Sequence, residues 1–217
     1  LTGVVSAAVF TTGSPTGLVA KAREVVHRSA APVAKDFGVA VESTVYHELR
    51  GTYEAPNFQK GDPPYMHPEA GGTIERNVAG EPMIARQETM RFALSVPKGT
   101  MPAEGWPVVL YAHGTGGSYR TFLRNGVAEN LAQVKDGSGK VIAQMAVIGI
   151  DQVLHGPRAP AGTAVDLAFF NFQNPAASVA NVLQGGIDNF QLLRLVKGLT
   201  FDSLPWLEGT NRSGSVD

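Results

Sequence analysis

VVLYAHGTGG, at residues 108–117, joins a short apolar run to a glycine-rich turn. The run is typical of a buried strand, and Leu123, Val127, Leu131 and Val134 recur at helical spacing within residues 119–134. Small residues between a strand and a helix let a ligand approach the backbone. The N–H groups at such a turn lack partners within the helix. The stretch therefore predicts a strand, a turn with free backbone donors, and a helix.

The segments around this stretch indicate the fold class. Residues 90–96 alternate as a half-buried strand does, and residues 145–151 (MAVIGID) are apolar enough for a strand buried on both faces. Asn174 and Pro175 predict the start of a helix. Its expected apolar stripe comprises Val179, Leu183, Ile187, Phe190, Leu193 and Val196, and the inserted glycines Gly185 and Gly186 indicate a close backbone contact. This order predicts an α/β fold with a largely parallel sheet flanked by helices.

The first 89 residues are more mixed. Patterns predict a strand at 4–10, a helix at 17–28 and a strand at 38–49. Residues 51–82 contain five prolines together with Tyr53, Phe58 and Tyr65, so we expect an extended arm laid on a surface. We therefore expect an N-terminal mixed α+β accessory segment, residues 1–89, before a core at 90–217.

Composition narrows the function classes. Hydrophobic residues make up 43% and charged residues 17%, which permits a sizeable core. A net charge of −1 gives no reason to expect a nucleic-acid partner, and the absence of cysteine excludes disulfides and thiolate metal sites. No apolar run approaches the ~20 residues of a transmembrane helix. Asp62, His67 and Glu69 match no strong metal pattern, so we expect neither a metal nor a cofactor.

Backbone donors held rigidly away from water stabilise the oxyanion that forms during acyl transfer. Two other glycine-rich motifs are excluded at residues 113–117. A dinucleotide fingerprint would need glycine where Tyr119 stands, and no Gly-Lys-Ser/Thr ending of a phosphate loop follows. A tight turn that only packs, or that binds phosphate, remains an alternative.

The loop HGTGG after a buried strand resembles the oxyanion loop of the α/β-hydrolase superfamily, which follows the third strand of that fold. MAVIGID fits the fourth strand, DQVLHGPR (151–158) resembles the turn after it, and FFNFQNPAASVANVLQGG (169–186) resembles bacterial secreted or lipoprotein esterases and lipases. The resemblance covers residues 90–217. It implies hydrolysis of a small-molecule or lipid ester, an extracytoplasmic or secreted location, and an oxyanion hole at Thr115 with Gly114 and Gly116.

The chain departs from that family at the nucleophile. The family carries Gly-x-Ser-x-Gly, but GSPTG at 13–17 has its serine one place early and Ser213 has Asn211 two residues before it. Because the triad order is Ser, Asp, His and the last histidine is His155, we expect all three members downstream of residue 217. The core would then be incomplete at its C-terminal side. A missing or companion segment would complete it, separated at the polar, cleavable tail 209–217.

A triad of Ser118, Asp151 and His155 has the right order, but Ser118 lies on the oxyanion loop itself. We expect His113 to be structural and His155 to line the pocket or to hold a loop. Phe169, Phe170 and Phe172 either line an acyl pocket or pack under the helix. Two alternatives to an esterase remain: a non-catalytic binding module, or an amidase or acyltransferase on the same scaffold.

Overall fold

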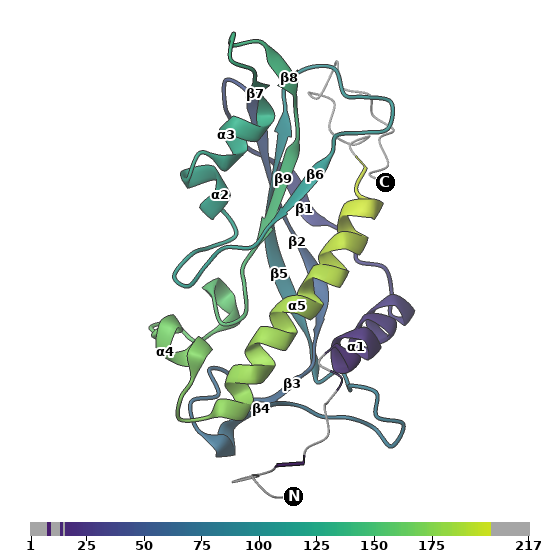
Figure 1. The fold of residues 1–217 in the computed structure, drawn as a ribbon, viewed down its shortest axis with the longest axis vertical. Coiled ribbons are helices and arrows are strands. Elements are labelled where there is room, and N and C mark those ends of the chain that lie inside the picture. The colour runs from purple at the N-terminus through teal and green to yellow at the C-terminus, as the bar shows by residue number, and fades with distance from the viewer. Residues whose placement is uncertain (1–7, 10–13, 15, 201–217) are drawn as a thin grey trace, which may run out of the picture.

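A five-stranded mixed sheet forms the centre of the computed structural model, with strand order β1-β2-β5-β9-β6 (Figure 1). The structure describes residues 8–9, 14 and 16–200. The strands of this sheet are β1 Lys35–Glu42, β2 Tyr46–Asn57, β5 Arg86–Pro97, β9 Ala146–Ile150 and β6 Val108–Tyr111. Two small antiparallel sheets pair β3 Gln59–Gly61 with β4 Gly71–Ile74, and β7 Val134–Lys135 with β8 Val141–Ala143.

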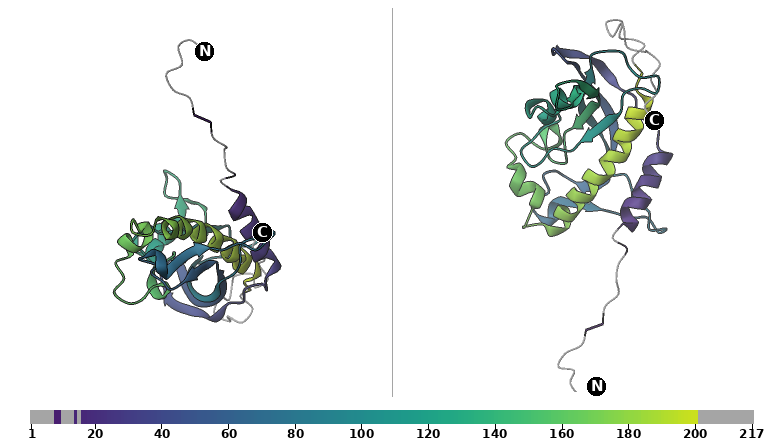
Figure 2. Two further views of the ribbon diagram at one scale, coloured as in Figure 1. Left: turned by 90° about the horizontal axis from the view of Figure 1, so that it is seen from below. Right: turned by 45° about the horizontal axis from the view of Figure 1, so that its top comes forward.

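Helices cover both faces of the central sheet. They are α1 Gly17–Arg28, α2 Thr121–Arg124, α3 Val127–Ala132, α4 Val165–Phe170 and α5 Pro175–Gly198, with the 3-10 turns η1 Pro68–Ala70 and η2 Gly156–Arg158. The long helix α5 crosses one face with α1 alongside it, and α2 and α3 lie on the other face (Figures 1 and 2). No described helix has the length and apolar character needed to cross a membrane.

The alternation of side chains along the strands builds one core on each face. On β5, Phe92 and Leu94 pack toward the C-terminal half of α5, and Ala93 between them packs toward α2 and α3. On β9, Ile148 likewise packs toward α5, and Val147 packs toward α2 and α3. All five residues of β9 are buried, which confirms the prediction that MAVIGID is a strand covered on both faces.

The predicted largely parallel sheet was wrong, because only β6 and β9 run parallel and the other three pairings are antiparallel. The coarser prediction of an α/β fold with a helix-flanked sheet is confirmed. The extra antiparallel strands come from the N-terminal region. Its expected strand at 38–49 is two strands, β1 and β2, joined by a turn, and both belong to the same sheet as β5. The boundary expected at residue 89 falls inside β5.

The expected surface arm at 51–82 was also wrong at its start. Residues 46–57 form β2, which pairs with β5 along its whole length. Gly51 weakens the strand pattern in the sequence, but a Cβ there would lie 2.9 Å from the ring of Phe92. The aromatic residues of this region (Tyr53, Phe58 and Tyr65) are fully buried, so their hydrophobicity was a better guide than the prolines.

The helix predicted at 17–28 is confirmed as α1, whereas the helix expected at 119–134 is split into α2 and α3. Gly126 causes the break, because its φ of 73° lies in the left-handed region. The start of α5 is as predicted, with the Asn174 side chain accepting a hydrogen bond from the N–H of Ala177. The strand expected at 4–10, the Ser213 segment and the tail 209–217 lie outside the described residues, apart from residues 8–9.

The buried face of α5 differs from the predicted apolar stripe. Val179 and Leu193 are 62% and 41% exposed, whereas Gln184 and Asp188 are buried. The side-chain oxygen of Gln184 accepts from the N–H of Phe58, and its amide donates to the oxygen of Pro56. Polar residues thus satisfy the backbone where β2 meets β3, a role that apolar spacing cannot reveal.

Candidate active site: the loop after β6 and its pocket

The loop at residues 112–118 lies at the carboxyl end of β6, as predicted. Because β6 and β9 are parallel, with Tyr111 opposite Gly149, the loop after β9 leaves the sheet at the same edge. Ligand sites of open α/β sheets lie outside the carboxyl ends of the strands. The two loops meet there and bring together His113 and His155, whose ring centroids are 4.6 Å apart.

Two histidines tie these loops to each other. The Nε2 of His113 accepts a hydrogen bond from the N–H of Gln152 at 3.0 Å, and its Nδ1 lies 2.8 Å from the oxygen of Gly114. The Nε2 of His155 accepts from the N–H of Gly116 at 3.1 Å, and its Nδ1 lies 2.9 Å from the oxygen of Val153. In each ring one nitrogen accepts from an N–H and the other faces a carbonyl. Both imidazoles are therefore neutral, with the proton on Nδ1.

Burial supports the neutral form of His113. Desolvation lowers the pKa of this imidazole, and the hydrogen bond to Gly114 opposes that shift without reversing it. The ring also requires glycine at position 117, because a Cβ on Gly117 would lie 2.7 Å from the Nδ1 of His113. The expected structural role of His113 thus has a specific form: it holds the loop against the end of β9.

Asp151 anchors the far end of the loop. One carboxylate oxygen accepts from the N–H of Tyr119 at 3.1 Å and the other from the Nε of Arg91 at 2.7 Å. The guanidinium of Arg91 also stacks on the ring of Tyr119. With Asp151 bound in this way and both nitrogens of His155 engaged by backbone groups, Ser118, Asp151 and His155 do not form a triad.

The three residues expected to form an oxyanion hole differ in what their N–H groups do. The N–H of Gly116 is bound to His155. Within the described part of the chain, the N–H groups of Gly114 and Thr115 make no hydrogen bond. Gly116 has a φ of 78°, so glycine allows the sharp turn that follows Thr115. Of the three residues, only Thr115 and Gly114 therefore keep a backbone N–H that is free to bind a ligand.

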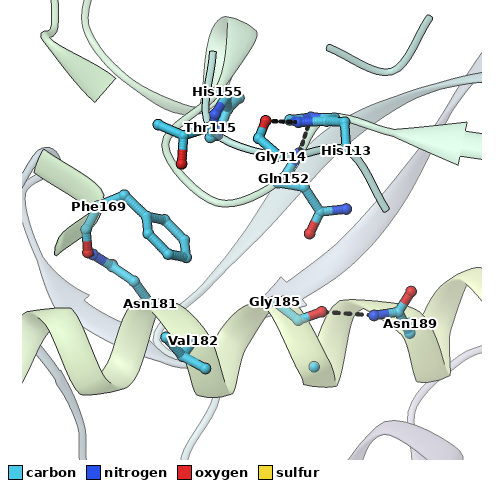
Figure 3. A pocket seen from close by; sticks show the side chains of 11 residues that line it. His113, Gly114, Thr115, Gln152, His155, Phe169, Asn181, Val182, Gly185 and Asn189 are labelled. Carbon is cyan, nitrogen blue, oxygen red and sulfur yellow. Dashed lines mark hydrogen bonds between the residues drawn. The ribbon is translucent and has the colours of Figure 1, made fainter. Parts of the chain in front are cut away.

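A pocket of about 290 Å³ opens beside this loop (Figure 3). The lining residues are His113, Gly114, Thr115, Gln152, His155, Phe169, Asn181, Val182, Gly185, Gly186 and Asn189. The expected pocket residues His155 and Phe169 are among them. Phe170 is not, although its ring contacts that of Phe169, and it is half exposed. Phe172 is 89% exposed and neither lines this pocket nor packs under the helix.

The sequence analysis did not identify the residues of α5 that line the pocket. Gly185 and Gly186 were expected to mark a close backbone contact, but a Cβ on Gly186 would meet nothing within 4 Å. On Gly185 its nearest neighbour would be the Oε1 of Gln152, at 3.7 Å. The glycines instead leave space on the pocket side of the helix. Two glycines inside a long helix were the available signal, and their cost to helix stability pointed to a function.

The three residues considered for a metal, Asp62, His67 and Glu69, are exposed around η1, away from this pocket. Among the described residues, no group of three or more His, Asp or Glu side chains is arranged to hold a metal ion. Comparisons of the chain with protein-family models, with curated proteins and with solved structures gave no match in any of the three.

Proposed function

We propose that this chain supplies the oxyanion-hole part of a carboxylic-ester hydrolase of the α/β-hydrolase type, which acts through an acyl-enzyme intermediate. The observation that carries the proposal is the N–H of Thr115. Thr115 lines the pocket, its N–H makes no hydrogen bond with the described residues, and hydrogen bonds to His113 and His155 link its loop to the loop after β9. Donors fixed in this way stabilise developing negative charge without reorganisation during the reaction.

The strand order supports this reading of the loop. Because β6 and β9 are parallel neighbours, the loops that follow them leave the sheet at the same edge, where open α/β sheets bind ligands. Here β9 follows the loop and lies between β6 and β5. In addition, β5 runs antiparallel to both β2 and β9.

The pocket favours an uncharged acyl or alcohol group. Its lining contains no Asp, Glu, Lys or Arg, and both histidines are neutral. Phe169 and Val182 supply apolar surface, whereas Phe170 lies outside and is proposed only for the rim. Esters are uncharged at the reacting group, so a small-molecule or lipid ester suits this pocket better than a phosphate does.

The nucleophile is proposed to come from another segment, because none of the 217 residues forms a Gly-x-Ser-x-Gly sequence. Two surfaces could receive that segment. The outer edge of β6 pairs with no described strand, and α5 exposes Val179, Val182 and Leu193. A strand added parallel to β6 would place its carboxyl end next to the oxyanion loop.

A serine-reactive fluorophosphonate tests the proposal on material purified from its native source. We expect the label on a serine within Gly-x-Ser-x-Gly, identified by denaturing mass spectrometry, in a segment outside residues 1–217. Isolated 1–217 should be unlabelled and should not hydrolyse 4-nitrophenyl butyrate. A label on a serine of 1–217 would contradict this division. A native assembly with neither label nor turnover would instead favour a non-catalytic binding module.

The same donors would serve an amidase or an acyltransferase. Initial rates on an ester, on its matched amide, and on the ester with added alcohol separate these activities. We expect the ester to be hydrolysed faster than the amide, with water as the main acceptor. A faster amide reaction, or transfer to the alcohol as the main outcome, would place the chain in one of these classes instead.

A further inference from the structure

Gln152 occupies a fixed position between the two loops of the site. It directly follows Asp151 at the end of β9. Its N–H donates to the Nε2 of His113 at 3.0 Å, and its carbonyl oxygen accepts from the N–H of His155 at 3.0 Å. Both backbone groups are therefore engaged by the residues that shape the oxyanion loop.

The carboxamide of Gln152 points into the pocket, toward α5 (Figure 3). Its Oε1 lies 3.7 Å from the position that a Cβ on Gly185 would take. Its Nε2 is buried and has no hydrogen-bond partner among the described residues. Buried amide groups are almost always hydrogen-bonded, and an exception calls for an explanation. A pocket occupant that supplies an acceptor would satisfy this group.

Three other buried side-chain atoms lack partners, and they provide a comparison. They are the hydroxyl of Tyr53, the Oε1 of Gln59 and the Nε1 of Trp106, none of which belongs to a residue that lines this pocket. Gln152 differs because it lines the same pocket as Thr115, whose N–H makes no hydrogen bond with the described residues. A ligand in this pocket would lie beside both residues.

The charge of the lining defines the ligand class. No carboxylate, ammonium or guanidinium group lines the pocket, and His113 and His155 are neutral. A charged ligand group would lose its hydration there without gaining a counter-charge. The acceptor that meets the Nε2 of Gln152 should therefore be a neutral oxygen.

We propose that Gln152 determines specificity by donating a hydrogen bond to a neutral hydroxyl or carbonyl oxygen that the substrate carries in addition to its scissile ester. The preferred substrates are uncharged, oxygen-substituted esters, such as hydroxyacyl esters, rather than plain alkyl esters. That the scissile group is an ester rests on the proposed function. The binding of a neutral oxygen by Gln152 does not.

Binding to the full 217-residue chain tests this inference without catalysis. The ¹⁵N-labelled chain is titrated by NMR with methyl 3-hydroxybutyrate, methyl butyrate and the 3-hydroxybutyrate anion. We expect methyl 3-hydroxybutyrate to shift the side-chain amide of Gln152 and the backbone N–H of Thr115. A neutral hydrogen bond predicts about threefold to tenfold weaker binding of methyl butyrate. The anion should bind more weakly than its methyl ester.

Two variants separate recognition from folding. Gln152→Met keeps the length of the side chain, and Gln152→Glu keeps an acceptor but loses the donor. Gln152→Met should remove the preference for the hydroxylated ester and leave methyl butyrate binding within about twofold of wild type. Gln152→Glu should weaken the binding of a carbonyl-substituted ester, which has no hydroxyl to donate to the new carboxylate. Gln87→Met, at an exposed position on β5, is the matched control and should keep the preference. Thermal melting and the spectra of α5 report whether each variant is folded.

The possible outcomes distinguish this inference from the proposed function. A preference that persists in folded Gln152→Met would overturn the inference, as would the absence of any shift at Gln152 in the wild type. If the native assembly hydrolyses esters but its kcat/KM for hydroxylated over plain esters is unchanged by Gln152→Met, the inference fails and the proposed function stands. Gln152-dependent binding in an assembly without hydrolase activity would support the inference and reject the function.

Discussion

The imidazole of His155 accepts a hydrogen bond from the backbone N–H of Gly116, a residue 39 positions earlier in the chain. This contact joins the loop after β9 to the loop after β6. It engages the N–H of Gly116 and leaves those of Gly114 and Thr115 without a hydrogen bond among the described residues. Thr115 lines the pocket beside the loop.

Removing this acceptor should loosen the loop. In His155→Ala, we expect the amide hydrogen of Gly116 to exchange with solvent at least about tenfold faster, because its hydrogen bond within the protein is lost. Hydrogen exchange followed by NMR on the isolated chain measures this. Replacement of the exposed His67 by Ala is the control and should leave Gly116 unchanged. Equal protection of Gly116 in His155→Ala would show that the loop does not depend on this bond.

The second prediction concerns the glycine packed against His113. In Gly117→Ala the new methyl group would lie 2.7 Å from the Nδ1 of His113, so the ring or the loop must shift. We expect the free energy of unfolding to fall by about 1–3 kcal/mol, as overpacking typically costs. Gly137→Ala, where a Cβ meets nothing within 4 Å, should change it by less than about 0.5 kcal/mol. Denaturant melts of both variants check this, and equal effects would exclude a steric role for the ring.

Local chemistry made part of this site predictable. The short apolar run, the glycines and the capping pair Asn174-Pro175 each act through neighbouring residues, so the sequence places β6, the loop and the start of α5 correctly. The spacing of the glycines also excluded a dinucleotide-binding turn, because Tyr119 occupies a position where that turn needs glycine.

Hydrogen bonds between polar groups far apart in the sequence could not be predicted. Gln184 is buried because it bonds backbone groups about 126 positions away in the chain, and no pattern within α5 reveals that partner. The same applies to Gln152, whose position depends on two histidines from separate loops. Gly51 misled the assignment of β2 because its small size serves Phe92, a residue on another strand.

The pH dependence of stability should reflect the neutral state of His113. Burial lowers the pKa of this imidazole below its ordinary value of 6.5. The unfolded chain therefore binds a proton more readily than the folded chain does. The stabilisation is complete above pH 6.5, and it is lost as pH falls from there toward the lower folded-state pKa.

Unfolding free energies measured between pH 5 and 8 check this expectation when they are compared with those of His113→Gln, whose residue 113 does not titrate. The difference between wild type and variant should shrink as the solution is acidified. An NMR titration of the His113 ring gives the folded-state pKa independently. A difference that grows on acidification would mean that the protonated ring is the stabilised form, which the hydrogen bond from Gln152 to Nε2 opposes.

The last prediction concerns the donor on which the proposed function depends. Thr115→Pro removes one N–H, and the preceding Gly114 tolerates the backbone that proline imposes on its neighbour. Loss of one oxyanion donor typically lowers kcat by ~10²–10³. We expect a loss of that order for the native assembly acting on an ester, with KM changed much less. Thr115→Ala keeps the N–H and should retain kcat within about tenfold, and melting temperatures of both variants report on folding. A folded Thr115→Pro assembly with wild-type kcat would mean that the N–H of Thr115 does not bind the oxyanion.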